Sequence, residues 1–213
     1  MSELAYEIYA IKYAHHARRR SENFIGGDPH DGPMPLDYFV WLIRGGGREV
    51  VVDTGFSAAV AAKRGRDHIR CPTAGLRLLG TEAKTVKDVV ITHLHYDHVG
   101  NFDLFPAATL HLQDLEMRYA TGRYMGHECF RGAYDVEDVV GMVRRVYEDR
   151  VRFHEGDAEL APGISLHLIG GHTMGLQVVR VQTRRGWVVL ASDASHFYAN
   201  MEETRPFPIV WSV

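Results

Sequence analysis

Alternating and apolar runs predict a set of strands in the N-terminal half of the chain. Apolar and polar positions alternate over residues 4–13, and strand-like runs over residues 38–43 and 49–52 flank a glycine-rich turn, which predicts a hairpin. A β-branched run at residues 89–91 predicts a buried strand, and residues 109–112 predict another. We therefore expect this half to build a sheet.

Helical signals separate these strands. Ser57 is typical of a helix N-cap, and the alanine-rich run after it stops at Gly65. Residues 74–80 and 114–120 predict two more helices. Valines recur along one face of a longer predicted helix over residues 136–147.

The C-terminal third changes to short strands. These are predicted at residues 151–154, 164–169, 176–183 and 186–191. Strand-rich halves with interspersed helices favour two packed sheets flanked by helices, an αββα sandwich of the α/β (α+β) class. Without a low-complexity linker or an internal repeat, we expect a single domain over residues 1–213.

Composition excludes several classes of protein. The chain has 213 residues, of which 46% are hydrophobic and 24% charged, and its net charge of −3 argues against a general nucleic-acid binder. No apolar run approaches the roughly 18–20 residues of a membrane helix, and no signal-peptide pattern is present. Two distant cysteines do not make a disulfide framework. We expect a cytoplasmic protein with neither nucleic-acid nor membrane partners, and the oligomeric state is left open.

A basic run at residues 15–20 precedes a loop at residues 23–35 that is rich in glycine and proline. In a chain of net negative charge, so short a basic run is interpreted as a solvated turn rather than a binding patch. A loop of this length inside a compact domain is often functional.

The chemistry concentrates directly after the predicted strand at residues 89–91, where His93, His95, Asp97 and His98 follow one another. In a core, three imidazoles and a carboxylate within six residues would repel and desolvate one another, and a divalent cation is the simplest partner that makes such a cluster favourable. The alternative is a polar loop with incidental histidines. In an extended loop His93 and His95 point the same way and can hold one ion. Asp97 and His98 come after the turn and can reach a second ion about 3.5–4 Å away.

This run resembles the HxHxDH signature of the metallo-β-lactamase superfamily. Further segments resemble the family's motifs in the same order: the Asp-Thr-Gly turn at residues 53–55, the Gly-His-Thr turn at residues 171–173, and the bridging-aspartate segment at residues 192–195. Within the superfamily, the branch that hydrolyses N-acyl homoserine lactones is the most similar, through Asp193-Ala194-Ser195. The resemblance implies the αββα fold.

The resemblance also implies a ligand set for two divalent ions. Zinc is expected, and iron or manganese is also compatible. The first ion takes His93, His95 and His172, the second takes Asp97 and His98, and Asp193 bridges both. Asp97 is counted among the catalytic residues as well. A hydroxide generated between the ions attacks the carbonyl carbon of a lactone, ester, thioester or amide.

Other residues receive roles by resemblance. Asp53 steadies a metal-binding histidine loop, since such partners orient imidazoles and set their tautomer. Its alternative is an ordinary turn residue. Phe24, Ile25 and Met34, in the loop at residues 23–35, are candidate pocket residues; the alternative for each is a loop residue packed on the sheet. His127 is a weaker candidate in an insert that often forms a lid over the metals.

Two departures from the family pattern concern the second ion and the substrate. A tyrosine usually follows the Asp-Ala-Ser segment, but here His196 holds that place and Tyr198 comes two residues later. Either is a candidate to contact the substrate carbonyl as a donor or acid. The family also has a later histidine ligand, and none follows His196 before the last residue, Val213. We expect that the last helix and strand of the fold are missing; alternatively His196 substitutes, or the second site is incomplete.

The sequence therefore predicts a dinuclear hydrolase that opens a lactone ring, perhaps that of a quorum-sensing signal. A thioesterase of the glyoxalase II kind uses the same ligand run. A di-iron redox protein is a different class: some relatives hold two irons and carry an attached flavin domain, which this sequence does not show, and iron content with oxygen consumption would favour this class. The remaining alternative is a catalytically incomplete fragment of such a hydrolase.

Overall fold

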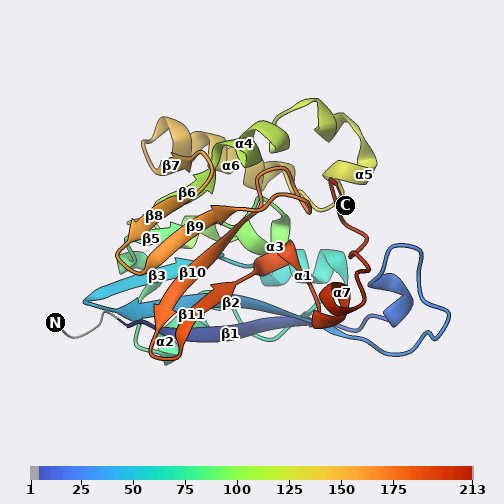
Figure 1. The fold of residues 1–213 in the computed structure, drawn as a ribbon. Helices are drawn as coiled ribbons and strands as arrows, with labels where there is room; N and C mark the ends of the chain where they lie inside the picture. The colour runs from blue at the N-terminus through green and yellow to red at the C-terminus, as the bar shows by residue number, and fades with distance from the viewer. Residues whose placement is uncertain (1–4, 213) are drawn as a thin grey trace.

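The computed structural model describes residues 5–212, which form two packed sheets (Figure 1). The larger sheet has, in spatial order, the strands β4 (Asp67–His68), β1 (Glu7–His16), β2 (Leu36–Gly45), β3 (Arg48–Val52), β5 (Asp88–Val90), β6 (Thr109–Gln113) and β7 (Val151–His154). The smaller sheet has β11 (Gly186–Leu190), β10 (Gln177–Thr183), β9 (Ile164–Leu168) and β8 (Ala158–Ala161).

Along the sequence, most of the helices come between strands of the larger sheet. They are α1 (Ala58–Arg64), α2 (Pro72–Leu78), α3 (Tyr96–Val99), α4 (Asp114–Ala120), α5 (Glu128–Arg131), α6 (Val136–Tyr147) and α7 (Tyr198–Glu202). The predicted limits of α1 are confirmed. The Ser57 side chain accepts a hydrogen bond from the Val60 N–H, and Gly65 ends the helix with a φ of 65°, which glycine adopts without strain.

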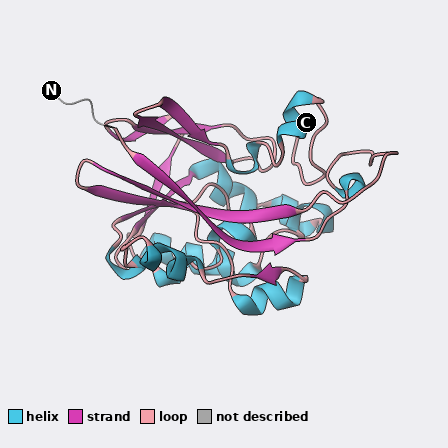
Figure 2. Cartoon of the chain, turned by 90° about the horizontal axis from the view of Figure 1, so that it is seen from below, coloured by secondary structure: helices cyan, strands magenta, loops and turns pink. Residues whose placement is uncertain are grey.

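Two apolar layers hold the sheets and helices together. One lies between the larger sheet and the helices, where Leu42 and Val89 pack in the same cluster as Leu76 of α2 and Met142 of α6. The other lies between the two sheets and includes Val50. Figure 2 shows the helices gathered against the sheets. The two-sheet sandwich is therefore confirmed.

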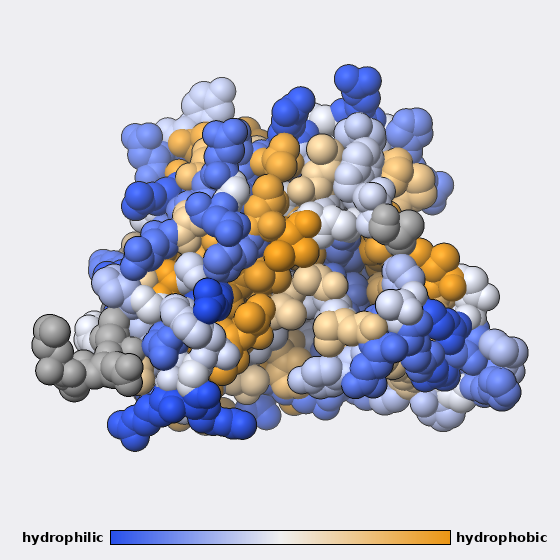
Figure 3. All heavy atoms as spheres, in the orientation of Figure 1, coloured by the Kyte–Doolittle hydropathy of each residue, from blue (hydrophilic) through white to orange (hydrophobic). Residues whose placement is uncertain are grey.

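The outer face of the smaller sheet lacks a helical layer within residues 5–212. Helices α1 to α6 contribute to or pack against the cluster on the larger sheet, while Asn200 of α7 donates to the backbone of Asn23 in the N-terminal loop. Trp187 and Val189 of β11 are about half exposed, at 48% and 52%. Figure 3 shows hydrophobic side chains gathered over this sheet. Three of the four expected layers are thus present.

The strand predictions succeed except at a few places. The predicted start of the first strand at residue 4 lies outside the described residues, and β1 runs on to His16. Strand β8 was not predicted, because its pairing with β9 is irregular between Glu159 and Ala161 and so blurs the alternation. No helix in the described residues is both long enough and apolar enough to cross a membrane.

The topology brings four loops to one edge of the sandwich. Strands β3 and β5 are parallel, so the loops that follow them leave the larger sheet at the same end. Strands β9 and β11 each pair antiparallel with β10, so both also end on one side of the smaller sheet. The four motifs predicted from the sequence therefore meet at this edge.

The contact between α2 and β1 gives a first test of the packing. A Cβ atom on Gly75 would lie 2.3 Å from Ile11 Cγ2, inside van der Waals contact with a stiff β-branched side chain. We expect Gly75→Ala to lower the free energy of unfolding by about 1–2 kcal/mol, because overpacking outweighs the better helix propensity of alanine. The melting temperature should fall by about 2–6 °C.

Gly32→Ala is the matched control, because a Cβ there meets no atom within 4 Å. It should change the stability by less than about 0.5 kcal/mol. Equal melting temperatures for the two variants would show that α2 does not pack closely on β1.

Candidate metal centre

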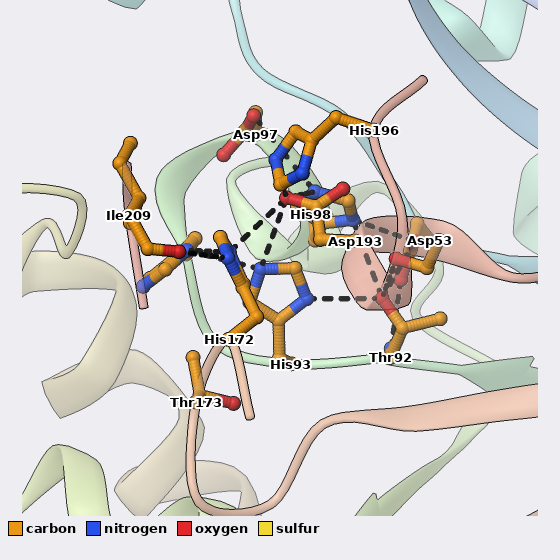
Figure 4. Close-up of polar contacts among 12 residues, drawn as sticks. Asp53, Thr92, His93, Asp97, His98, His172, Thr173, Asp193, His196 and Ile209 are labelled. Atoms are coloured by element: carbon orange, nitrogen blue, oxygen red, sulfur yellow. Dashed lines mark hydrogen bonds and ion pairs between the residues drawn. The ribbon is translucent and has the colours of Figure 1, made fainter. Parts of the chain in front are cut away.

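Three histidine nitrogens converge on one point at the edge where the four loops meet. His95 Nδ1 lies 3.0 Å from His93 Nε2 and 2.9 Å from His172 Nε2. The nearest oxygen of Asp193, Oδ2, is 3.1 Å from His172 Nε2 and 3.8 Å from His93 Nε2. The four ligand atoms all lie within 4.8 Å of one another. Figure 4 shows most of this convergence.

A second set of side chains surrounds the same Asp193 carboxylate. His98 Nε2 lies 3.5 Å and His196 Nε2 3.1 Å from Asp193 Oδ2. Asp97 Oδ2 lies 3.8 Å from His98 Nε2. All six predicted ligands are therefore brought together, and His196 joins them.

The carboxylate of Asp53 anchors the histidine loop through hydrogen bonds. Its Oδ1 accepts from the Thr92 N–H at 2.8 Å, and its Oδ2 accepts from the Thr92 hydroxyl at 2.8 Å and from His98 Nδ1 at 2.7 Å. Asp53 is fully buried and has a φ of 62°, a conformation that aspartate tolerates better than most residues. Because Nδ1 of His98 donates to this carboxylate, Nε2 is left free to face Asp193.

Two more contacts set the tautomers of the converging histidines. The Ile209 carbonyl accepts a hydrogen bond from His172 Nδ1 at 2.6 Å. The Thr92 hydroxyl donates a hydrogen bond to Asp53 and accepts one from His93 Nδ1, which lies 3.2 Å away. Both rings therefore turn an unprotonated Nε2 toward the centre.

Glu116 ties together three segments around the centre, and sequence reasoning missed it. This side chain of α4 is fully buried. Its Oε1 accepts from the Leu94 N–H and the Tyr134 hydroxyl at 2.9 Å each, and its Oε2 accepts from the Thr173 hydroxyl at 2.6 Å and the Gly175 N–H at 3.1 Å. The only sequence signal was a glutamate on the apolar face of a short helix.

Burial and neighbouring charges shift the pKa values in opposite directions. Burial lowers the pKa of His93 and His95 well below the usual range, and the adjacent imidazoles lower it further. Burial also works to raise the pKa of Asp193, but His196, His98 and His172 together hold it well below its ordinary value. His93 and His95 are therefore neutral and Asp193 is ionised, as metal ligands must be.

The residues present fit a divalent metal ion. The unprotonated Nε2 atoms of His93 and His172 both turn their lone pairs toward His95 Nδ1, at 2.9–3.0 Å, and a cation at this point can accept all three nitrogens. Three imidazoles with a carboxylate form a donor set that zinc accepts. The partners of His172 and His98, a backbone carbonyl and a buried carboxylate, are those that usually orient such ligands.

A cavity of about 640 Å³ opens above the centre, a size typical of small-molecule sites. His95, Asp97, His98, His172, Asp193 and His196 line its floor. Tyr198 also lines it, but with 79% exposure this side chain lies at the rim. His196, by contrast, lies beside Asp193 next to the centre.

The predicted pocket residues of the N-terminal loop were wrong. Phe24, Ile25 and Met34 do not line the cavity. Phe24 is buried beneath the guanidinium groups of Arg20 and Arg205 instead. His127 is exposed in the insert and also lies outside the cavity lining.

Comparisons with known proteins place most of this chain in one family. The family model described as the metallo-beta-lactamase superfamily matches residues 34–210. An N-acyl homoserine lactonase of Bacillus cereus is 29% identical over 133 residues, which is 62% of this chain and 48% of that protein. The N-acyl homoserine lactonase AiiB of Agrobacterium fabrum is 29% identical over 177 residues, 75% of this chain and 63% of that protein. The chain thus spans about half to two thirds of the length of these relatives.

Solved structures show the same fold. A quorum-quenching N-acyl homoserine lactone lactonase superposes with a TM-score of 0.80 at 23% identity, covering 98% of this chain and 81% of that chain. An N-acyl homoserine lactone hydrolase with N-hexanoyl-L-homoserine bound at its catalytic metal centre has a TM-score of 0.79 at 22% identity, covering 98% of this chain and 83% of the other.

The four hydrogen bonds to Glu116 generate a prediction for stability. Glu116→Ala leaves two backbone N–H groups and two hydroxyls without their acceptor in a buried site. It should therefore lower the free energy of unfolding by about 3 kcal/mol or more, measured by urea denaturation. Glu159→Ala on exposed β8 is the control and should stay within about 0.5 kcal/mol of the wild type. Equal losses for both variants would contradict the role of Glu116.

Proposed function

This chain belongs to the metallo-β-lactamase superfamily, and on that premise we propose that it is a dinuclear metal-dependent hydrolase that opens a lactone ring. The observation that carries the proposal is the convergence of His93, His95, His172 and Asp193, whose ligand atoms lie within 4.8 Å of one another beneath a cavity that the last three line. The relatives named N-acyl homoserine lactonases support the lactone as the substrate class.

We assign the ligands by their contacts. The first ion takes His93, His95 and His172, whose nitrogens face one point. Asp97 and His98 take the second ion, and Asp193, which approaches both sets, bridges the two. Zinc is the expected metal. Ions bound there would lower the pKa of a shared water and polarise the lactone carbonyl.

The protein groups supply orientation and exclude water. Asp53 and Glu116 fix the histidine loop through buried hydrogen bonds, so that the ligands need no reorganisation when the substrate binds. We assign to His196 the contact with the substrate carbonyl. It stacks on Phe207 with ring centroids 3.6 Å apart and an interplanar angle of 8°, which holds its imidazole beside Asp193.

Removing a central ligand tests the site. His95→Ala should lower the bound metal and lactone hydrolysis together, because Nδ1 of His95 contacts both of the other histidine ligands. Elemental analysis of the purified protein and a pH-stat assay of ring opening measure the two effects. His127→Ala removes an exposed histidine outside the cavity and should change neither. Full turnover by His95→Ala would sink the assignment.

His196→Ala separates a role at the carbonyl from a role in metal binding. If His196 contacts the substrate, kcat should fall by about 10²-fold while the metal content stays at the wild-type value. Loss of one metal ion per chain would instead make His196 a ligand. Phe197→Ala, which changes the neighbouring aromatic residue, serves to measure the effect of disturbing this segment alone.

A further inference from the structure

Three arginines line the cavity above the candidate metal centre. They are Arg18, in the basic run two residues beyond the end of β1, and Arg64 and Arg66, at the end of α1 and just beyond it. None of the three forms an ion pair with a carboxylate within residues 5–212, whereas the neighbouring Arg19 and Arg20 pair with Asp31 and Asp28. The interpretation of the run as a solvated turn therefore fails for Arg18.

Arg64 and Arg66 both contact the side chain of Tyr96. Arg66 Nε donates to the Tyr96 hydroxyl at 3.3 Å, and Arg64 Cζ lies 3.8 Å from the centroid of the Tyr96 ring. Tyr96 stands in sequence between the ligands His95 and Asp97. Both guanidinium groups therefore contact a side chain of the ligand loop itself.

Arg18 reaches the centre from a different segment. Its Cζ lies 5.0 Å from the centroid of the Phe207 ring. Phe207 stacks on His196, and His196 Nε2 lies 3.1 Å from Asp193 Oδ2. The positive charges therefore stand against both the Tyr96 and the His196 parts of the cavity wall.

Neutral acceptors hold these arginines in place without cancelling their charge. Arg18 donates to the Asn23 side chain at 2.6 Å and to the Glu22 carbonyl at 2.5 Å. Arg66 Nη1 donates to the Arg64 carbonyl at 2.6 Å and lies 3.1 Å from His16 Nε2. Arg64 Nε is buried and has no hydrogen-bond partner in the described part of the chain.

The acidic groups near this wall are already engaged. Asp37 lines the cavity, but its carboxylate pairs with Lys12 and His15 at 2.7 Å each. Asp97 and Asp193 belong to the candidate metal centre. Burial lowers the pKa of Arg18 from its ordinary value, although the charge of Glu22 works to raise it.

We propose, building on the lactone hydrolysis proposed above, that Arg18, Arg64 and Arg66 form a subsite for a carboxylate that the substrate carries away from its scissile carbonyl. A guanidinium presents a planar fork of N–H donors that matches a carboxylate. An aliphatic acyl chain against the same wall would leave three cations with neither water nor a counter-ion, which is costly. The preferred substrate is therefore an acidic lactone or ester.

A matched pair of lactones tests the subsite. One is N-glutaryl homoserine lactone, which ends in a carboxylate, and the other is its terminal carboxamide, which has the same shape and no charge. The wild type should hydrolyse the carboxylate with a kcat/KM at least about tenfold higher. This preference should shrink as the ionic strength rises. Succinyl and adipoyl pairs cover other distances from the scissile carbonyl.

Variants locate the source of the preference. In the double variant Arg18→Met, Arg66→Met, the ratio of the two kcat/KM values should fall toward one, with metal content unchanged. Arg152→Met, an exposed arginine outside the cavity, should keep the wild-type ratio. If the double variant does not fold, Arg18→Lys alone should still reduce the ratio, because lysine keeps the charge but loses the fork.

The outcomes are distinct from those for the proposed function. Equal kcat/KM values for both members of every wild-type pair, or a ratio unmoved by the arginine variants, would overturn the subsite. If the metal-loaded wild type hydrolyses no lactone, the proposed function fails instead. In that case glutarate should still raise the melting temperature of the wild type more than glutaramide does. If glutarate and glutaramide raise the melting temperature equally, or if their difference persists in the double variant, the subsite is overturned without reference to lactone hydrolysis.

Discussion

The crowding of imidazoles around Asp193 is the constraint on which the rest of this structure depends. Burying His93, His95 and His172 with their nitrogens turned to one point removes these nitrogens from water, which is costly unless each finds a partner, so the surrounding fold has to impose it. Two buried carboxylates do so. Asp53 anchors the start of the ligand loop to the end of β3, and Glu116 joins that loop to the turn that carries His172. A bound cation converts the imposed geometry into a favourable one.

The local patterns of the sequence were enough for most of the fold and for the side chains that meet at the candidate metal centre. The β-branched run of β5 and the glycine turn before His172 each predict the end of a strand. The histidines and aspartate found at these strand ends then predict a metal site. Strand β8 escaped prediction because its pairing is irregular. Glu116 escaped because its value lies in four partners from segments up to 59 residues away, and no local pattern records such contacts.

Local sequence patterns also failed to identify the residues of the cavity wall. Phe24 looked like a pocket residue because it is aromatic and lies in a long loop, yet it packs beneath two arginines. Arg18 looked solvated because it stands in a short basic run, yet it lines the cavity while its neighbours form ion pairs. Alternate residues of an extended segment face opposite ways, and which of them meets the cavity is decided by the rest of the chain.

The central claim is that two ions act together in this centre. The most direct test is to titrate the metal-free protein with zinc while following bound metal and lactone hydrolysis in the same samples. We expect binding to saturate at two ions per chain and most of the activity to appear with the second equivalent, since Asp193 contacts both ligand sets. Full activity at one ion per chain, or two bound ions without hydrolysis of any lactone, would contradict it.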